Sequence, residues 1–450
     1  MDTIAALSTA PAMSGVGVIR ISGERALAVL TAVFKSKTAL YPRQMVLGNL
    51  VNTDGIIIDC CMAVYFAAPA SFTGEDVCEL HCHGSLAVLN SALNLCMSAG
   101  ARPARAGEFT KRAFLNGKLD LLQAEAVGEL IAAETEDAAK NAAAMLGGAL
   151  GRALSDIYEK LMDMLARFRA VADYPEEDIE PEEIPEMLAV LGEARAKLSE
   201  IQRRSERGKL FREGINCAII GRPNAGKSSL LNALAGETRA IVTEIPGTTR
   251  DIVEQRVSLG GLTLRLRDTA GLRDTADEIE KIGVTLALAA AETAELVLAV
   301  FDGGAPLSAE DFTVISAAKA AKNVVWALNK SDLETEKTLV ALAVHGITPI
   351  LISTKSGAGL DLLESEIRRF FDAGDLRFDG TLMTSARQEA ACKAAIESLA
   401  AGEAALASGA AADMALFDVE SACDKLAELF GKTVGEDIID RVFANFCVGK

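Results

Sequence analysis

Residues Gly221 to Ser229 have the types and spacing of a phosphate-binding loop. Their sequence, GRPNAGKSS, fits the pattern G-x-x-x-x-G-K-[ST]. It follows an apolar run, Ile215–Ile220, that predicts a strand, and it precedes the helix-like run Leu230–Leu234. Glycines let backbone N–H groups approach phosphate oxygens, and a helix N-terminus favours negative charge. We therefore expect Lys227 to reach the outer phosphates of a nucleotide and Ser228 to bind magnesium.

Further motifs indicate which nucleotide the loop binds. Asp268–Gly271 (DTAG) can hold magnesium through water and approach the γ-phosphate, and a Thr within Gly247–Asp251 can complete the magnesium shell. Asn329–Asp332 (NKSD) ends in a carboxylate that can accept two hydrogen bonds from guanine N1–H and its exocyclic amine, which adenine cannot supply. Ser353–Lys355 (STK) matches a guanine-contacting S-A-K turn, with Thr in place of Ala. The order of these motifs predicts a GTPase.

The hydrolytic residue is not evident from the motifs. In Ras-type GTPases a Gln after D-x-x-G positions the attacking water, but this chain has Leu272, which cannot polarise water. Another group must therefore do so. Glu280, at the start of a helical run beyond Gly271, is one candidate, although its pattern also fits an ordinary solvated helix residue.

The elements that position these motifs divide the chain into three predicted domains. Residues 1–118 show short strands such as Gly15–Ser22, Met62–Phe66 and Asp76–His81, with a few helices, which predicts an α+β domain. Residues 119–210 plus 372–450 form a discontinuous helical domain. Residues 211–371, which alternate strands and helices, form an inserted α/β domain of the Ras-like P-loop GTPase class.

Within these domains, several element predictions are specific. Helical periodicity over Leu121–Ala172 predicts one or two long helices, a further helix covers about Met187–Arg207, and helix returns over residues 384–446. Gly260-Gly261, between Asp251–Leu259 and Leu262–Arg267, predicts a hairpin.

Composition limits the partners and the compartment. The net charge of −18 argues against a protein that grips nucleic acid by itself over a broad surface. No run of eighteen apolar residues appears, so we expect no membrane span. The N-terminus shows no signal-peptide pattern, and the nine scattered cysteines indicate reduced thiols, which together predict a cytoplasmic protein.

A cluster of soft ligands, Cys78, His81, Cys82 and His83, raises the question of a metal site. In a strand, alternate side chains point to opposite faces, so Cys78 and Cys82 face the core while His81 and His83 face away, together with Glu79. Because metal ligands must converge on one point, we expect these four residues not to form a metal site.

Three stretches outside the nucleotide motifs carry a family resemblance. They are Gly17–Gly23 (GVIRISG), Ser71–Asp76 (SFTGED) and Gly107–Asp120 (GEFTKRAFLNGKLD). With the phosphate loop, Gly247–Asp251 and the terminal Phe446–Lys450 (FCVGK), they make the whole chain resemble the MnmE (TrmE) family of GTPases, which act in tRNA wobble-uridine modification. Departures are small and comprise Val448, Ser85, the STK turn and a glycine-poor first loop, Pro11–Ser14.

The resemblance implies roles for residues that the motifs alone do not assign. Glu280 falls on the catalytic glutamate, and Cys447, which could also be a small buried hydrophobe of the last helix, falls near the one-carbon unit. Magnesium would be bound by Ser228 and Thr249. Potassium would be bound by Asn224, Thr243, Ile245 and Thr248, and would act electrostatically as an arginine finger does. A 5-formyl- or methylene-tetrahydrofolate would be bound by Arg20, Glu79, Lys118 and Lys450, making residues 1–118 a tetrahydrofolate-binding and dimerisation domain.

The motifs and the resemblance together define the predicted GTP-binding residues. They are Asn224, Ala225, Gly226, Lys227, Ser228, Ser229, Thr243, Glu244, Ile245, Pro246, Gly247, Thr248, Thr249, Asp268, Thr269, Ala270, Gly271, Asn329, Lys330, Ser331, Asp332, Ser353, Thr354 and Lys355.

The resemblance also implies partners and a reaction. It implies a homodimer and a FAD-dependent MnmG-like protein, in a heterotetramer or a larger assembly, that together add a carboxymethylaminomethyl-type group to C5 of the wobble uridine of tRNA. Two alternatives remain open from the sequence. One is a ribosome-assembly GTPase switch, which would be expected to carry a basic RNA-binding module. The other is a folate-dependent aminomethyltransferase that works without a partner.

Overall fold

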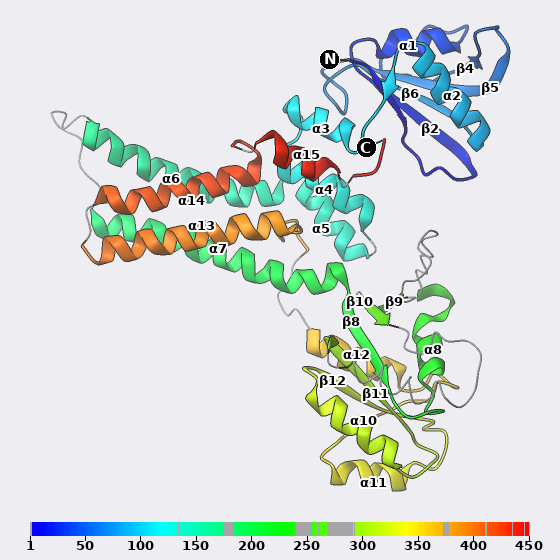
Figure 1. Ribbon diagram of the computed structural model, residues 1–450, viewed down its shortest axis with the longest axis vertical. Helices are drawn as coiled ribbons and strands as arrows, with labels where there is room; N and C mark the ends of the chain where they lie inside the picture. Colours follow the sequence, from blue (N-terminus) through cyan, green and yellow to red (C-terminus); the bar gives the residue numbers. More distant parts are fainter. Residues whose placement is uncertain are drawn as a thin grey trace. The chain divides into compact units, whose positions relative to one another are not determined.

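A computed structural model describes most of the chain. The described residues are 2–133, 135–173, 183–239, 254–259, 262–267, 291, 293–371, 378–409, 412–433, 435–444 and 446–449. They separate into two compact units, one formed by Met1–Ala132, Asn141–Gln202 and Asp379–Lys450, the other by Ala133–Lys140 and Arg203–Phe378. Figure 1 labels their elements. The predicted combination of α+β, helical and α/β architecture is confirmed.

A seven-stranded mixed sheet occupies the N-terminal part of the first unit, in the order β3-β4-β5-β6-β2-β1-β7. Its strands are β1 (Ile4–Leu7), β2 (Ser14–Ser22), β3 (Phe34–Lys35), β4 (Val46–Val51), β5 (Ile57–Phe66), β6 (Val77–Gly84) and β7 (Arg102–Pro103). Helices α1 (Ala26–Val33) and α2 (Leu86–Ser98) contribute to the same hydrophobic core as β2, β5 and β6. Alternating residues of these strands enter this core, as a sheet packed on one face requires.

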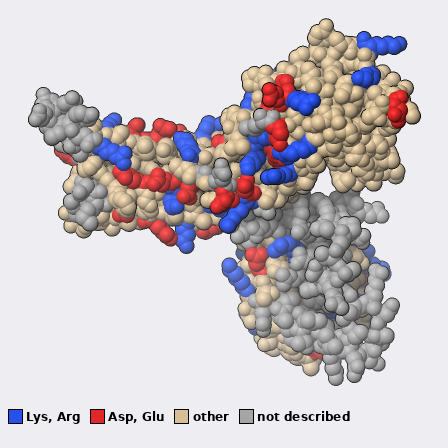
Figure 2. Space-filling model, turned by 45° about the horizontal axis from the view of Figure 1, so that its top comes forward, with Lys and Arg blue, Asp and Glu red and all other residues tan. Residues whose placement is uncertain are grey.

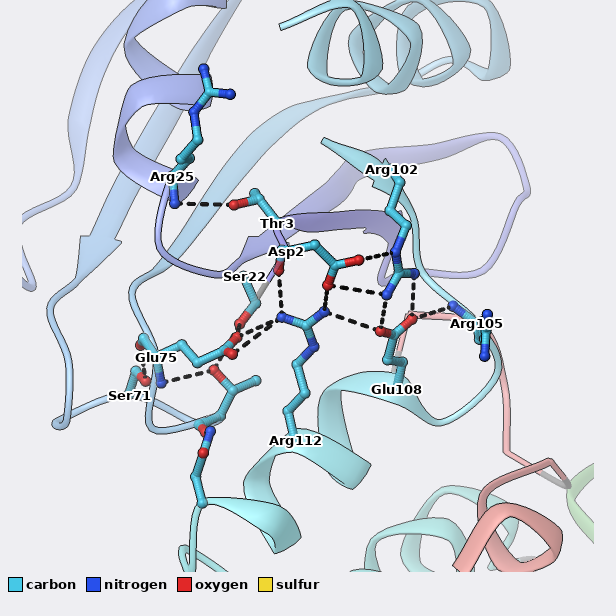
Figure 3. A network of polar contacts seen from close by, with 12 residues as sticks. Asp2, Thr3, Ser22, Arg25, Ser71, Glu75, Arg102, Arg105, Glu108 and Arg112 are labelled. Atoms are coloured by element: carbon cyan, nitrogen blue, oxygen red, sulfur yellow. Dashed lines mark hydrogen bonds and ion pairs between the residues drawn. The ribbon is translucent and has the colours of Figure 1, made fainter. Parts of the chain in front are cut away.

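The short helix α3 (Glu108–Leu115) is joined to the N-terminal sheet by a network of ion pairs (Figure 3). Arg112 is buried, and its guanidinium bonds to Asp2 at 2.7 Å, Glu75 at 3.0 Å and Glu108 at 3.1 Å. Arg102 pairs with both Asp2 and Glu108. The network therefore connects the start of the chain, the loop before β6, strand β7 and α3.

Helices form the rest of the first unit. They are α4 (Leu121–Ala132), α5 (Glu136–Leu146), α6 (Ala149–Asp173), α7 (Ile184–Glu213), α13 (Ala386–Ala407), α14 (Ala412–Phe430) and α15 (Glu436–Ala444). The start of α5 and the end of α7 belong to the second unit. Leucines of α6, α7, α13 and α14 share one buried cluster, and Figure 1 shows these four helices side by side. Buried Glu125 of α4 accepts hydrogen bonds from Arg387 and Gln388 at the start of α13, which holds these distant segments together.

Two helix predictions differ from the structure. The region Leu121–Ala172 contains three helices rather than one or two, and Gly147 and Gly148 separate α5 from α6. Gly148 has φ +82°, a left-handed conformation that favours glycine and ends a helix. Helix α7 begins at Ile184, before the predicted start at Met187, because Pro185 can occupy a first helical turn.

A six-stranded sheet forms the centre of the second unit, in the order β13-β12-β11-β8-β10-β9. Its strands are β8 (Ile215–Ile220), β9 (Glu254–Leu259), β10 (Leu262–Arg267), β11 (Leu296–Asp302), β12 (Val324–Asn329) and β13 (Ile350–Leu351), and its helices are α8 (Lys227–Arg239), α10 (Ala309–Ala320), α11 (Glu336–Val344) and α12 (Leu360–Phe371). Strands β9 and β10 pair antiparallel, as the hairpin prediction requires, and all other pairs are parallel.

Strand β11 shows why this sheet is buried on both faces. Its alternate residues Leu298 and Val300 belong to one hydrophobic cluster, whereas Ala299 and Phe301 belong to another. Such a continuous apolar run is typical of a parallel strand covered by helices on both sides. Among the described residues, no helix is long and apolar enough to cross a membrane.

Candidate functional site

A cavity of about 400 Å³ lies at the carboxyl ends of the parallel strands β8, β12 and β13. Ligands of open α/β sheets bind at this edge. The cavity is lined by Asn224, Gly226, Lys227, Ser228, Ser229, Asn329, Lys330, Asp332, Leu333, Ser353, Thr354 and Lys355. It therefore brings together the phosphate loop and both predicted guanine motifs, which are about a hundred residues apart in the sequence.

The phosphate loop has the backbone conformation that its sequence predicts. Asn224 and Gly226 have φ of +59° and +98°, so the chain winds tightly before α8 begins at Lys227. A Cβ atom at Gly226 would lie 2.0 Å from the Asn329 amide nitrogen, so no larger residue fits there. The Lys227 ammonium donates to the carbonyl oxygens of Gly221 and Arg222, at 2.8 and 2.9 Å. This places its charge at the loop where the phosphates of a nucleotide would lie.

Asn329 joins the phosphate loop to the second guanine motif. Its side-chain nitrogen donates to the Ala225 carbonyl at 3.0 Å, and its side-chain oxygen accepts from the Thr354 N–H at 3.1 Å. Asn329 is buried, so both polar atoms need these partners. One side chain thus sets the spacing between the part of the cavity suited to phosphate and the part suited to a base.

Asp332 is the carboxylate available to a base. It is bonded by the Ser353 hydroxyl at 2.8 Å, and this hydrogen bond holds the pKa of Asp332 below its usual value. The carboxylate is therefore ionised at neutral pH and can only accept hydrogen bonds. Guanine presents two adjacent donors, so the geometry favours guanine over adenine.

Two predicted GTP-binding residues do not line this cavity. Ala225 is fully buried beneath the loop, and Ser331 donates its backbone N–H to the Ile352 carbonyl. Other predicted residues lie outside the part of the chain that the structure describes. They are the candidate catalytic Glu280 and the predicted GTP-binding residues Thr243, Glu244, Ile245, Pro246, Gly247, Thr248, Thr249, Asp268, Thr269, Ala270 and Gly271.

Acidic residues behind the cavity were missed by the sequence analysis. Asp302, the last residue of β11, bonds the Lys330 ammonium at 2.7 Å and lies 3.8 Å from the Arg222 guanidinium. Arg222 also pairs with buried Asp311 at 3.3 Å. No sequence motif marks Asp302, since its partners are distant in the chain. Leu333, which also lines the cavity, directly follows the NKSD motif.

In the first unit, the structure brings two of the predicted folate residues together. Arg20 on β2 lies opposite Glu79 on β6, and the Arg20 Nε atom bonds the Glu79 carboxylate at 2.9 Å. The Arg20 guanidinium also lies 5.6 Å from the Phe72 ring and 5.8 Å from the Phe109 ring. These two aromatic residues were not among the predicted site residues. Phe72 belongs to the motif SFTGED, and Phe109 belongs to the motif GEFTKRAFLNGKLD.

The other predicted folate residues are placed less completely. The Lys118 ammonium donates to the Pro69 carbonyl at 3.2 Å, and its side chain packs beside Gly74 in the loop that also carries Phe72. Lys450 lies outside the described residues.

Cys447 is exposed and follows α15 rather than lying in it, so the interpretation as a buried residue of the last helix is wrong. Its carbonyl accepts a hydrogen bond from the Gly107 N–H, and Val448 bridges Ala106. The Ser8 hydroxyl donates to the Gly449 carbonyl. The C-terminal segment is thereby tied to the end of β1 and the start of α3.

Comparison with known proteins identifies the family. A sequence model described as the MnmE helical domain matches residues 121–447, and one described as the GTP-binding protein TrmE N-terminus matches residues 3–118. The tRNA modification GTPase MnmE of Heliobacterium modesticaldum is 42% identical over 469 residues, covering 100% of this chain and 99% of that protein. The chain belongs to the MnmE family.

Two further MnmE proteins agree over the same length. Those of Clostridioides difficile and Acetivibrio thermocellus are 40% and 39% identical, each covering 100% of this chain and 99% of the relative. Among solved structures, the G domain of the T. maritima FeoB iron transporter is 28% identical over 34% of this chain and 96% of that chain, with a TM-score of 0.26. That likeness is too low to support an argument, and the family assignment rests on the sequence matches.

Proposed function

We propose that this chain hydrolyses GTP as part of tRNA modification, adding with a flavoprotein partner a carboxymethylaminomethyl-type group to C5 of a wobble uridine. The observation that carries the proposal is the cavity in which a phosphate loop and the base-reading Asp332 are held together by Asn329. The full-length match to tRNA modification GTPases supports the second half of the proposal.

The cavity fits the metal ions that the hydrolysis would use. The Ser228 hydroxyl follows Lys227 at the start of α8 and lines the cavity, where it would hold magnesium together with Thr249. Asn224 lines the same cavity, and its left-handed backbone turns the loop tightly there. Its amide oxygen would bind potassium with Thr243, Ile245 and Thr248. A potassium ion there would supply positive charge to the phosphates, and Glu280 would orient the attacking water.

A tetrahydrofolate fits the chemistry of the region around Arg20. Arg20 and Glu79 are each about five-sixths buried, with side-chain exposures of 17% and 16%, and two aromatic rings flank the guanidinium. A carboxylate can accept hydrogen bonds from the amine and N–H groups of a pterin, while Lys118 and Lys450 suit the carboxylates of its glutamate tail. The folate would supply a one-carbon unit, and Cys447 at the end of the chain would lie near it.

The charge and the surface support the proposal that a protein partner helps to hold the tRNA. On the face drawn in Figure 2, Lys and Arg are interleaved with Asp and Glu along the helices, and the described residues there form no broad basic area. Phosphate contacts dominate affinity for nucleic acid, so tRNA would be held jointly with a MnmG-like, FAD-dependent protein. We also propose a homodimer, a cytoplasmic location, and three domains covering residues 1–118, 119–210 with 372–450, and 211–371.

Two measurements on the purified chain test the GTPase part. GTP turnover should fall when potassium is replaced by sodium at equal ionic strength, and equal rates would contradict the potassium site. Glu280→Ala should abolish turnover while leaving the affinity for a GTP analogue unchanged. Glu310→Ala, an exposed glutamate at the start of α10, is the matched control and should leave both unchanged.

A third measurement tests the tRNA part. Mass spectrometry of wobble uridines from a strain lacking this protein should show loss of the C5 substituent. Intact uridines with defective ribosomes would instead support an assembly GTPase. Product formed in vitro by this chain alone, without a flavoprotein, would support an independent aminomethyltransferase.

A further inference from the structure

Three potential metal ligands converge inside the N-terminal sheet, on the face covered by α1 and α2. Asp59 and Cys61 lie two residues apart on β5, so both point to the same face of the sheet. Cys82 lies on the neighbouring strand β6 and points into the same core. One carboxylate oxygen and the two sulfur atoms all lie within 4.8 Å of one another, and all three side chains are buried.

Strand register explains this convergence. Met62 pairs with His81 in the antiparallel ladder of β5 and β6, so Cys61 lies directly opposite Cys82. Their sulfur atoms therefore lie on the same side of the sheet, within 4.8 Å of each other. The alternation of side chains along β6 argues against a metal site made from Cys78, His81, Cys82 and His83. A pattern along one strand does not reveal which side chains Cys82 meets on the adjacent strand.

The Asp59 carboxylate is already oriented by its neighbour. One oxygen accepts a hydrogen bond from the His83 backbone N–H at 2.9 Å, and the other lies 2.7 Å from the His83 Nδ1 atom. Carboxylates that bind metals are held in this way by an outer hydrogen-bonding partner. The His83 side chain is 71% exposed, so the cluster lies beside a route to solvent.

We propose that Asp59, Cys61 and Cys82 form a binding site for a thiophilic divalent cation of the zinc type. Ligand atoms around tetrahedral zinc are about 3.6–3.8 Å apart, which follows from Zn–S and Zn–O distances of about 2.3 and 2.1 Å. The separations in the cluster, at most 4.8 Å, need to contract by no more than about 1.2 Å. Three protein ligands leave a fourth position for water.

Binding would proceed with a balanced exchange of protons. Two Zn–S bonds form as two S–H bonds break, and the two protons leave to solvent, while the Asp59 carboxylate adds one Zn–O bond. No oxidant or reductant takes part. The ion would link β5 to β6 beneath the helices, within the first compact unit and outside the nucleotide-binding cavity.

Other cysteines of the same core provide a contrast. Cys78 and Cys96 are fully buried, and burial raises the pKa of each thiol, that of Cys96 to about 12. Neither belongs to the cluster. They behave as small hydrophobic residues and provide matched controls for substitution.

The test uses the full-length chain, freed of metal by a chelator and then titrated with Zn²⁺ or Cd²⁺ alone. We expect one equivalent bound per chain, with ultraviolet thiolate-to-cadmium absorption. Cys61→Ala with Cys82→Ala should abolish the absorption, whereas Cys78→Ala should retain it. His83→Ala should weaken binding about 10–100-fold, as loss of an outer hydrogen-bonding partner does.

Readouts on the unmodified chain keep the proposal testable if the double variant fails to fold. The ¹¹³Cd resonance of the unmodified protein should report a ligand set with two sulfur atoms. The absence of a bound equivalent, a resonance of oxygen ligands only, or unchanged binding by the double variant would each overturn the proposal. A Cys61–Cys82 disulfide found by peptide mapping of the isolated protein under non-reducing conditions would overturn it too.

Discussion

At the residue scale, the position of Asp332 in the cavity predicts that this carboxylate selects the base. Replacing it by Asn puts an amide donor opposite a guanine donor, and a hydrogen bond to a charged group contributes about 1.5–3 kcal/mol. Asp332→Asn should therefore weaken GTP binding by about 10- to 100-fold. Xanthosine triphosphate, which has a carbonyl in place of the guanine amine, should bind the variant better than it binds the unmodified chain. Titration of the variant and of the unmodified chain with both nucleotides measures this change in base preference.

The control for this substitution is an aspartate outside the cavity. Asp361→Asn alters an exposed residue at the start of α12 and should leave both affinities unchanged. A variant at residue 332 that keeps its affinity for GTP would show that another group reads the base.

The residues of this site differ in how far the sequence reveals them. Lys227, Ser228 and Asp332 belong to contiguous motifs, since a loop that wraps a phosphate or a base must be continuous, and a sequence pattern can therefore detect them. Asp302, by contrast, bonds to Lys330 and Arg222, which are distant from it in the chain. Its role depends on strand order and register, which local patterns do not contain.

At the element scale, Asp302 links the loop after β8 with the loop after β12. Lys330 has φ +62°, a strained conformation for lysine, and Asp302 holds its ammonium at 2.7 Å. Asp302→Asn should loosen both loops and weaken nucleotide affinity about 10-fold, the effect of one lost charged hydrogen bond at the lower end of its range. Maximal turnover should change less than KM, because Asp302 is a positioning residue without a nucleotide contact.

Steady-state kinetics over a range of GTP concentrations separates these two effects. Asp302→Glu, which keeps the charge, should recover part of the affinity. Glu310→Gln, an exposed residue of the neighbouring helix α10, serves as control. A fall in kcat at unchanged KM would contradict a positioning role.

The elements themselves were predicted with mixed success. Strand β8 matches its predicted range because apolar residues of a buried parallel strand end sharply at the loop glycine. The break between α5 and α6 was missed because alanines and leucines continue the helical pattern on both sides of Gly147 and Gly148. Strand β13 has only two residues, Ile350 and Leu351, which directly follow Pro349 and pair with β12.

The ion pairs that join α3 to the N-terminal sheet should make its stability depend on pH. Burial alone would raise the pKa of Glu108, but hydrogen bonds from Arg102, the Arg105 N–H and Arg112 outweigh it and lower that pKa from 4.5 to about 2. The pKa of Asp2 is also lowered, chiefly by Arg102. A carboxylate whose pKa is lowered by folding stabilises the fold at any pH above the pKa that the group has in the unfolded chain. This contribution is lost as the pH falls from about 4.5 towards about 2. Hydrogen-exchange protection of β1 and α3, corrected for intrinsic rates, should fall in that window.

Removing Arg112 tests the same network at neutral pH. Arg112→Ala leaves partly buried carboxylates without their partner, and breaking a buried ion pair costs about 3–5 kcal/mol. Lys111→Ala, on the same helix, removes an ion pair with the exposed Asp440 and should cost less than about 1 kcal/mol. Equal losses of α3 protection in the two variants would contradict the importance of the network.

At the scale of the whole molecule, the N-terminal sheet exposes neighbouring apolar side chains, and we propose that a second copy of the chain covers them. Leu47 of β4 and Met62 of β5 are cross-strand neighbours and are 66% and 40% exposed, and Met45 and Ile57 are also exposed. Neighbouring exposed apolar side chains of this kind mark protein interfaces. The nucleotide cavity belongs to the other compact unit. Dimer formation through this face and nucleotide binding should therefore be separable by mutation.

Leu47→Asp places a charge on this face and should convert a dimer into a monomer, because burying an unpaired carboxylate is strongly unfavourable. Light scattering after size-exclusion chromatography measures the mass. The affinity for a GTP analogue should remain unchanged, whereas potassium-stimulated turnover should fall if two copies are needed to assemble the hydrolytic site. Val344→Asp, at an exposed position on α11, is the control and should leave the mass unchanged. A Leu47→Asp protein that remains dimeric would place the interface elsewhere, and one that becomes monomeric yet keeps full turnover would show that each chain hydrolyses GTP by itself.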